Sequence, residues 1–319
     1  MQRNPDIQLS AIVPVGRRHG DLRALHAEYR GGLNDTRLSW ELIYVLDGAY
    51  ADAATTLDAL VKEEPRISVV HLSRAFGEST ALMVGFSQAS GDLILTLPAY
   101  HQISGDQIPK LLQALDSADI VVSQRWPRAG GPFESLRRGA FHGLVNWMTG
   151  LDLHDLGCSA RAMKRQVLED VALYGDQHRL LPALADRQGF RVRECRVTQS
   201  PQDHFAGRYR TRDYAHRILD LFAVFFLVRF TKKPLRFFGM VGAATLSVGS
   251  ILVIYLVTDR LIFGHSLADR PALLLSSLLV VLGLQLFALG LLGELIIFTH
   301  ARDLRDYKID RIVDFSTDA

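Results

Sequence analysis

The stretch "GDLILTLPAYHQISGDQIPKLL", residues 91–112, contains a strand, a loop and the start of a helix. The apolar run Leu93–Leu97 predicts a buried strand, Pro98 ends it, and Asp106 lies near the start of the following helix. In α/β enzymes ligands bind outside the carboxyl ends of the strands, so acidic metal ligands are expected here. The loop at residues 98–101 reads Pro-Ala-Tyr-His and contains no acid. The stretch therefore predicts an α/β fold in which the loop after this strand contains no acid that could bind a metal.

Runs rich in β-branched and aliphatic residues recur before residue 210, with helical stretches between them. The predicted strands are residues 10–15, 41–46, 67–73, 92–97 and 119–124, with a further candidate at 191–197. Dense helical segments are predicted at Phe133–Met148 and Lys164–Gln188. Strands and helices that alternate at this spacing predict a mostly parallel sheet with helices on both faces.

The later part of the chain is far more apolar. The 319 residues are 48% hydrophobic and 22% charged, which excludes a disordered chain. Phe237–Thr258 and Ala272–Gly293 are each 22 residues long without a charged side chain. A bilayer is crossed by about 20 apolar residues. A pair of core helices in a soluble domain is the alternative, but such helices rarely need so long an uncharged run. We therefore expect a two-helix transmembrane hairpin.

Basic residues flank both spans, whereas the connecting loop at 259–270 holds two arginines. The flanking set is Arg229, Lys232, Lys233 and Arg236 before the first span, and Arg302, Arg305, Lys308 and Arg311 after the second. By the positive-inside rule both termini are expected in the cytoplasm, and the polar start "MQRNPDIQLS" shows no signal peptide. Cys158 and Cys195 are expected to serve packing alone, because no cysteines are paired at metal-ligand spacing.

Residues 213–233 join the two parts. Asp213, His216 and Asp220 fall on one helical face and apolar side chains cover the rest, which predicts a helix lying in the membrane interface. A helix packed on the cytoplasmic domain is the alternative. The predicted organisation is a cytoplasmic domain at 1–212, an interfacial helix at 213–233, two transmembrane helices within 234–300 and a cytoplasmic tail at 301–319.

A series of motifs carries a family resemblance. They are "IVPV" (12–15), "YVLDGAYAD" (44–52), "LSRAFGESTALMVGFSQASGDLILTL" (72–97), "QIPKLL" (107–112), "HDLGCSARAMKR" (154–165), "FAGRYR" (205–210), "KKPLRFFGMVG" (232–242) and "GLLGELI" (290–296). In their order and spacing, the chain resembles the membrane-anchored family 2 glycosyltransferases, which include dolichol-phosphate mannose synthases and bacterial undecaprenyl-phosphate glycosyltransferases. The resemblance implies a GT-A nucleotide-binding domain, transfer of a sugar from a nucleotide sugar to a polyprenyl phosphate, and a place in the inner membrane and cell envelope.

The resemblance also shows what this chain lacks. The family holds Mg²⁺ or Mn²⁺ through an Asp-x-Asp motif after the fourth strand, and the two aspartates match Pro98 and Tyr100. A family Tyr-Asn-Glu matches residues 16–18, Gly-Arg-Arg, and a family Asp-Asp-Gly-Ser matches residues 46–49, Leu-Asp-Gly-Ala. We therefore expect a degenerate metal site at Pro98, Tyr100 and His101, with no metal ligands and no predicted cofactor.

The residues that remain imply a site. By resemblance, Asp155 is the candidate catalytic base, and donor or phosphate binding is implied for Pro14, Asp47, Arg74, Arg161, Arg208 and Arg210. Alternatives stay open for several positions. Asp155 can serve as a turn residue, His101 as a substitute ligand or a surface group, and Arg74 as a phosphate contact or a structural ion pair. Arg125 and Arg128 can supply charge to a diphosphate, although a solvated basic loop is favoured.

Two functions follow from these observations. One is an active glycosyltransferase in which basic side chains replace the metal, since arginine clamps can stabilise a leaving diphosphate. The candidate cations are Arg17, Arg18, His101, Arg125, Arg208 and Arg210. The other is a catalytically inactive homologue that acts as a membrane scaffold, a lipid-binding protein or a regulatory partner. The expected partners are a polyprenyl phosphate, a nucleotide sugar and the membrane, with no nucleic acid. The resemblance also implies a homo-oligomer, such as a tetramer.

Overall fold

The computed structural model describes residues 4–127, 139, 143, 146, 153–171, 173, 177–203, 234–263 and 271–300. It divides into two compact units, one built on a sheet and one built on two long helices. Each unit is described by itself. The predicted interfacial helix at 213–233, the tail at 301–319 and most of the helix predicted at 133–148 lie outside the described residues.

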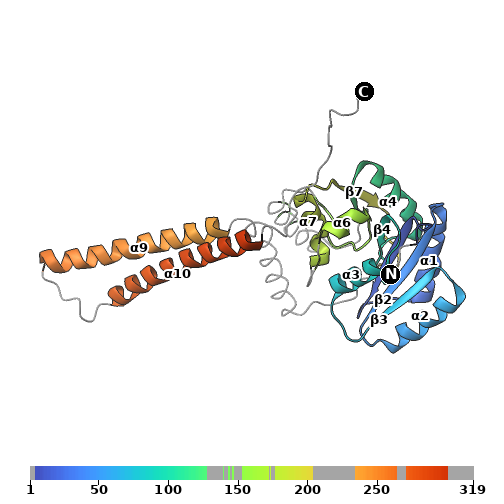
Figure 1. Cartoon of the computed structure of the whole chain (residues 1–319), viewed down its shortest axis with the longest axis horizontal. Helices are drawn as coiled ribbons and strands as arrows, with labels where there is room; N and C mark the ends of the chain where they lie inside the picture. Colours follow the sequence, from blue (N-terminus) through green and yellow to red (C-terminus); the bar gives the residue numbers. More distant parts are fainter. Residues whose placement is uncertain are drawn as a thin grey trace, which may run out of the picture. The chain divides into compact units, whose positions relative to one another are not determined.

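A seven-stranded mixed sheet forms the centre of the first unit, in the order β3-β2-β1-β4-β6-β5-β7 (Figure 1). Its strands are β1 (Leu9–Val15), β2 (Trp40–Asp47), β3 (Ile67–Leu72), β4 (Leu93–Thr96), β5 (Ile120–Arg125), β6 (Arg161–Lys164) and β7 (Val192–Val197). Neighbouring strands pair in parallel, except that β6 runs antiparallel to both β4 and β5. The six predicted strands are confirmed, and their ends differ by at most one residue.

Helices cover both faces of this sheet. They are α1 (Leu22–Asp35), α2 (Ala51–Glu63), α3 (Glu78–Gln88), α4 (Ile108–Ala114), α6 (Arg165–Asp170) and α7 (Leu181–Arg187), with 3-10 turns η1 (Gly105–Gln107), η2 (Leu115–Ser117) and η3 (Gln177–Leu180). Side chains alternate along β1, so that Val13 packs in one core with Leu25 of α1, while Ile12 packs in another with Ala81 of α3. Cys158 and Cys195 are both buried in the first of these cores, as predicted.

The helix predicted over Lys164–Gln188 is wrong in part. Lys164 ends strand β6, and the segment after it is divided into α6, η3 and α7. β6 has only four residues, "RAMK", and none of them is β-branched or aromatic. Its strand conformation is therefore imposed by pairing with β4 and β5 rather than by its own propensity.

Ligand binding is expected where β1 and β4 lie side by side. The chain runs outward from β1 through β2 to β3 and then returns to place β4 on the other side of β1. This reversal is a topological switch point, and crevices outside the carboxyl ends of strands at such points bind ligands. The residues that follow β1 and β4 therefore form the edge where a site is expected.

The second unit is a helical hairpin of α9 (Pro234–Phe263) and α10 (Pro271–His300), which lie side by side in Figure 1. Both helices are long and apolar enough to cross a membrane, and they contain the two predicted spans. Only 17% of the most apolar 18-residue stretch of α9 is buried, and only 11% of that of α10. Core helices of a soluble domain would be mostly buried, so this exposure favours the transmembrane interpretation.

Small residues let α9 and α10 approach closely. A Cβ atom added at Gly242 of α9 would lie 2.7 Å from the backbone nitrogen of Phe287 and 2.8 Å from the carbonyl oxygen of Gly283, both in α10. These distances are shorter than any ordinary contact. The hairpin therefore depends on glycine at this crossing, as is common where membrane helices pack.

We expect Gly242→Leu to destabilise the hairpin by about 1–3 kcal/mol, because the added side chain overpacks a backbone contact. The measurement is the thermal unfolding midpoint of the purified protein in detergent. Ala244→Leu is the matched control, since Ala244 lies on the exposed side of the same helix. Equal midpoints for the two variants would contradict the close packing at Gly242.

Candidate functional site

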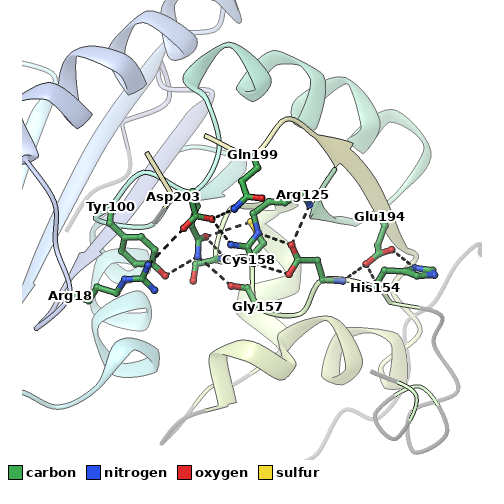
Figure 2. Close-up of polar contacts among 12 residues, drawn as sticks. Arg18, Tyr100, Arg125, His154, Gly157, Cys158, Glu194, Gln199 and Asp203 are labelled. Carbon is green, nitrogen blue, oxygen red and sulfur yellow. Dashed lines mark hydrogen bonds and ion pairs between the residues drawn. The ribbon is translucent and has the colours of Figure 1, made fainter. Parts of the chain in front are cut away.

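An ion pair between Arg125 and Asp155 lies at the carboxyl edge of the sheet (Figure 2). Arg125 ends β5, and its Nε and Nη2 donate to Oδ2 and Oδ1 of Asp155 at 2.7 and 2.9 Å. The two side chains are 6% and 2% exposed. Burial alone lowers the pKa of Arg125, but the hydrogen bonds and charge of Asp155 raise it above its ordinary value. The guanidinium is therefore a permanently charged, buried group.

A second carboxylate completes the surroundings of Arg125. Its Nη1 donates to Oδ2 of Asp203 at 2.8 Å, and the Asp203 side chain is 5% exposed. Gln199 also donates to this oxygen, at 2.9 Å. The solvated basic loop favoured for Arg125 is thus wrong, because two carboxylates enclose this guanidinium. Arg128 lies outside the described residues.

The loop that carries Asp155 is fastened to β7. The Glu194 side chain accepts hydrogen bonds from the backbone nitrogens of His154 and Asp155, at 2.6 and 3.1 Å. Its other oxygen lies 2.9 Å from Nδ1 of His154. Asp155 is therefore held through both its main chain and its side chain.

Tyr100 lies beside this cluster with an arginine stacked on it. The guanidinium carbon of Arg18 is 3.7 Å from the centre of the Tyr100 ring, and its Nη2 lies 3.8 Å from Oδ1 of Asp203 (Figure 2). Nε2 of Gln102 donates to the Tyr100 hydroxyl at 2.8 Å, and the other end of Gln102 accepts from the backbone nitrogen of Ser159 at 2.9 Å. Asp203 thus links Arg125 to the Arg18–Tyr100 stack.

A small cavity of about 10 Å³ lies between β1, β4 and α3. Its lining includes Pro14, Thr96, Ser159, Arg161, Glu78 and His178. Arg161 is buried, which lowers its pKa, and one of its terminal nitrogens donates to the His178 carbonyl oxygen. Its Nε has no hydrogen-bond partner among the described residues.

Glu78 supplies negative charge to this cavity. Oε2 of Glu78 lies 3.1 Å from Nε2 of His178, and Oε1 accepts from the Ser159 hydroxyl at 3.2 Å. Burial raises the pKa of Glu78, but the hydrogen bond and charge of His178 and the charges of Arg179 and Arg161 lower it to about 2. The group is therefore ionised at neutral pH.

Two other predicted residues form a separate cluster. The carboxylate of Asp47 accepts from the backbone nitrogens of Phe76 and Gly77, at 2.6 and 2.9 Å. The Arg74 guanidinium lies 4.9 Å from the ring centre of Phe76. Asp47 thus holds the turn between β3 and α3, and Arg74 remains an exposed cation on that turn.

His101 is neither a surface group nor part of the Arg125 cluster. Its Nδ1 lies 2.8 Å from a carboxylate oxygen of Glu28 in α1, and the other Glu28 oxygen accepts from the Gly105 backbone nitrogen at 2.9 Å. This arrangement fastens the loop after β4 to α1. The interpretation of His101 as an ordinary surface histidine is wrong, because only 11% of its side chain is exposed.

Apart from His101 and Pro98, which contact α1, the described predicted site residues fall into three groups. Asp155 and Tyr100 are joined through Arg125, Asp203 and Arg18, while Pro14 and Arg161 line the small cavity and Asp47 and Arg74 lie on the turn after β3. Arg208 and Arg210 lie outside the described residues. The sequence analysis missed Asp203, Glu78 and His178. Glu78 begins α3 and lies in the family motif at residues 72–97, so the sequence could have indicated it. Asp203 follows an ordinary turn, and nothing in the sequence there indicates a functional residue.

In a comparison with protein families, residues 10–172 match the model described as glycosyl transferase family 2. The chain belongs to glycosyl transferase family 2. Among curated relatives, an undecaprenyl-phosphate 4-deoxy-4-formamido-L-arabinose transferase from Aeromonas hydrophila subsp. hydrophila is 30% identical, over 98% of this chain and 97% of the relative. A dodecaprenyl-phosphate galacturonate synthase from Rhizobium johnstonii is 29% identical, over 93% and 90%.

Solved structures share the fold of this family 2 domain. A glucosyl-3-phosphoglycerate synthase from Mycobacterium tuberculosis, in complex with Mn²⁺, uridine diphosphate and phosphoglyceric acid, aligns with a TM-score of 0.51 and 20% identity. The alignment covers 70% of this chain and 78% of that one. The predicted GT-A fold class is thereby confirmed.

The residues at the expected place of the family's metal motif do not fit a metal ion. Pro98 is buried and its carbonyl oxygen accepts a hydrogen bond from the Tyr29 hydroxyl at 2.9 Å. Tyr100 is a neutral phenol, and burial raises its pKa further. Across the described ranges, no group of three or more His, Cys, Asp and Glu side chains could hold a metal ion. A divalent cation prefers several oxygen ligands, which this loop does not offer.

We expect Arg125→Met to destabilise this family 2 domain by about 3–5 kcal/mol, because it leaves buried carboxylates without a counter-charge. The measurement is the denaturant-induced unfolding of the full chain in detergent. Arg23→Met is the control, since Arg23 forms an exposed pair with Glu63 on α1 and α2. A similar loss in both variants would refute a special role for the buried pair.

Proposed function

We propose that this chain is a membrane-anchored glycosyltransferase that moves a sugar from a nucleotide sugar to a polyprenyl phosphate. The observation that carries the proposal is the extent of the similarity. Relatives that transfer sugars to undecaprenyl or dodecaprenyl phosphate match 98% and 93% of this chain, a range that includes both apolar helices. The α9–α10 hairpin supports the same reading, because a polyprenyl acceptor resides in a membrane.

The proposed reaction is a single displacement. An oxygen of the acceptor phosphate forms a bond to the anomeric carbon, the bond from that carbon to the nucleoside diphosphate breaks, and the electron pair leaves with the diphosphate. A phosphate monoester with a second pKa of about 6 is already mostly ionised at neutral pH. The nucleophile therefore needs orientation more than deprotonation.

The surroundings of Asp155 agree with a role in positioning. Both of its carboxylate oxygens accept hydrogen bonds from Arg125, so proton uptake at Asp155 would break a buried ion pair. We propose that Asp155 fixes Arg125 and the edge of the site, and that the acceptor attacks as its dianion. Pro14, Arg74, Arg161, Arg208 and Arg210 remain proposed donor or phosphate contacts, whereas Asp47 is proposed to hold the turn that presents Arg74.

The membrane arrangement is part of the proposal. We place the chain in the bacterial inner membrane with both termini in the cytoplasm, a catalytic domain at 1–212, an interfacial helix at 213–233, the hairpin within 234–300 and a tail at 301–319. The basic residues on both flanks of the hairpin support this orientation. We further propose a homo-oligomer, which the molecular mass in detergent would reveal.

We expect the purified protein to transfer sugar from at least one nucleotide sugar to undecaprenyl phosphate. The donor panel includes galacturonate and 4-deoxy-4-formamido-L-arabinose nucleotides, because relatives transfer these sugars. The measurement is the appearance of a lipid-linked labelled sugar after extraction into organic solvent. Absence of transfer with every donor would refute the proposal and leave the non-catalytic homologue as the better description.

The role of Asp155 is tested separately, by the kcat and the pH–rate profile of a variant. We expect Asp155→Asn to lower kcat by about 10²-fold or more, while the acid limb of the pH–rate profile remains near the phosphate pKa of about 6. Circular dichroism checks that the variant is folded. Disappearance of that acid limb in Asp155→Asn would instead make Asp155 the general base.

We expect a fluorescent protein fused after Ala319 to be fluorescent in the cytoplasm, because the residues after α10 are rich in Lys and Arg. Alkaline phosphatase fused at the same place is expected to be inactive, whereas its insertion between α9 and α10 is expected to give activity. The opposite pattern would overturn the proposed topology.

A further inference from the structure

The position of the second aspartate in the family's metal motif is occupied by an aromatic ring and a cation. Tyr100 stands at this position, and the Arg18 guanidinium lies over its ring with its carbon 3.7 Å from the ring centre. Such a contact is a cation–π interaction. The place where the family would hold a metal is therefore occupied by the positive charge of Arg18, and the loop at 98–101 contains no acid.

Several contacts fix the Tyr100 ring and the loop that carries Arg18. The Tyr100 hydroxyl accepts from Gln102, which is itself bonded to the 157–159 segment. The backbone nitrogen of Gly20 donates to the carbonyl oxygen of Ala99 at 2.8 Å, which ties the loop after β1 to the loop after β4. Oδ1 of Asp203, 3.8 Å from Nη2 of Arg18, also holds the guanidinium beside the ring. Arg18 is thereby oriented before any ligand arrives.

Two other described cations near this loop, Arg125 and His101, are less suited to a diphosphate. Arg125 is 6% exposed and enclosed by the carboxylates of Asp155 and Asp203, and His101 is held by Glu28. Arg18 differs from them, because 47% of its side chain is exposed. It can therefore meet a ligand from solvent while it remains on the Tyr100 ring.

We propose that Arg18, seated on the Tyr100 ring, takes the place of the divalent metal in binding the diphosphate of the nucleotide sugar. The inference rests on the proposed function and names the cation of the same site. A guanidinium presents N–H donors in a planar fork that matches two phosphate oxygens. When the bond between the anomeric carbon and the diphosphate breaks, negative charge develops on the leaving oxygen, and Arg18 stabilises that charge.

The test is calorimetric titration of the full-length protein in detergent with UDP, CDP, GDP and ADP, in EDTA and then in Mn²⁺. We expect at least one diphosphate to bind in EDTA, with an affinity that Mn²⁺ changes by less than about twofold. Arg18→Ala is expected to weaken that binding by about tenfold or more, because a charge-assisted contact is lost. Tyr100→Leu is expected to weaken it about two- to fivefold, and Tyr100→Phe to weaken it less than Tyr100→Leu does, because the ring supports the guanidinium and the hydroxyl only anchors the ring to Gln102.

Arg23→Ala is the matched control, since it removes one positive charge from an exposed, ion-paired arginine on α1 without touching Tyr100. The same variants are then compared in the lipid transfer assay. Transfer that requires Mn²⁺ or Mg²⁺, or that is unchanged in Arg18→Ala, would overturn this inference and leave the proposed function standing. A wild-type protein that neither binds a diphosphate nor transfers sugar would overturn both.

Discussion

The edge of the sheet depends on one buried guanidinium. Arg125 ends β5 and is enclosed by Asp155 and Asp203, which follow it in the chain by 30 and 78 residues. A charge removed from water costs several kcal/mol unless close partners compensate it. The two carboxylates provide that compensation only if the segments that carry them fold back onto the end of β5. The ion pairs therefore determine where the 153–161 segment and the turn before residue 204 lie.

The same interaction limits the chemistry that Asp155 can perform. Its carboxylate is shared between the Nε and Nη2 of Arg125, and its main chain is held by Glu194. A general base needs an oxygen that can accept a proton without breaking a buried charge pair. Because a phosphate acceptor arrives already ionised, the reaction has no need of such a base. A rigid carboxylate that positions a cation is therefore consistent with this nucleophile, whereas it would be poorly suited to a sugar hydroxyl.

The sheet could be predicted well from the sequence, because most of its strands consist of residues that favour the strand conformation. β1 and β2, "LSAIVPV" and "WELIYVLD", are rich in β-branched and aliphatic residues and are buried on both faces. β6 has no such residues and could not be predicted, because its conformation comes from β4 and β5. The two apolar spans could also be predicted from the sequence, because they are recognised by their length and lack of charge alone.

The site was less predictable because its contacts join distant segments. The sequence shows that Pro98 and Tyr100 replace expected acids, but it gives no sign that Arg18 lies on the Tyr100 ring or that Asp203 encloses Arg125. Arg125 looked solvated, because nothing near it in the chain reveals two buried carboxylates. β1 and β4 are neighbours in the sheet, and the Gly20–Ala99 hydrogen bond brings their loops together.

The replacement of the metal site is chemically coherent when the charges are considered together. Loss of the two carboxylates removes the ligands of the divalent cation, and without that cation the diphosphate would lack its counter-ion. An aromatic ring at Tyr100 supports the guanidinium without adding another negative charge beside it, whereas a carboxylate at that position would join Asp203 in pairing with Arg18 and reduce its attraction for phosphate. Tyrosine at position 100 and arginine at position 18 are therefore complementary, and in the proposed mechanism the lack of acid in the loop at 98–101 lets Arg18 stabilise the leaving group.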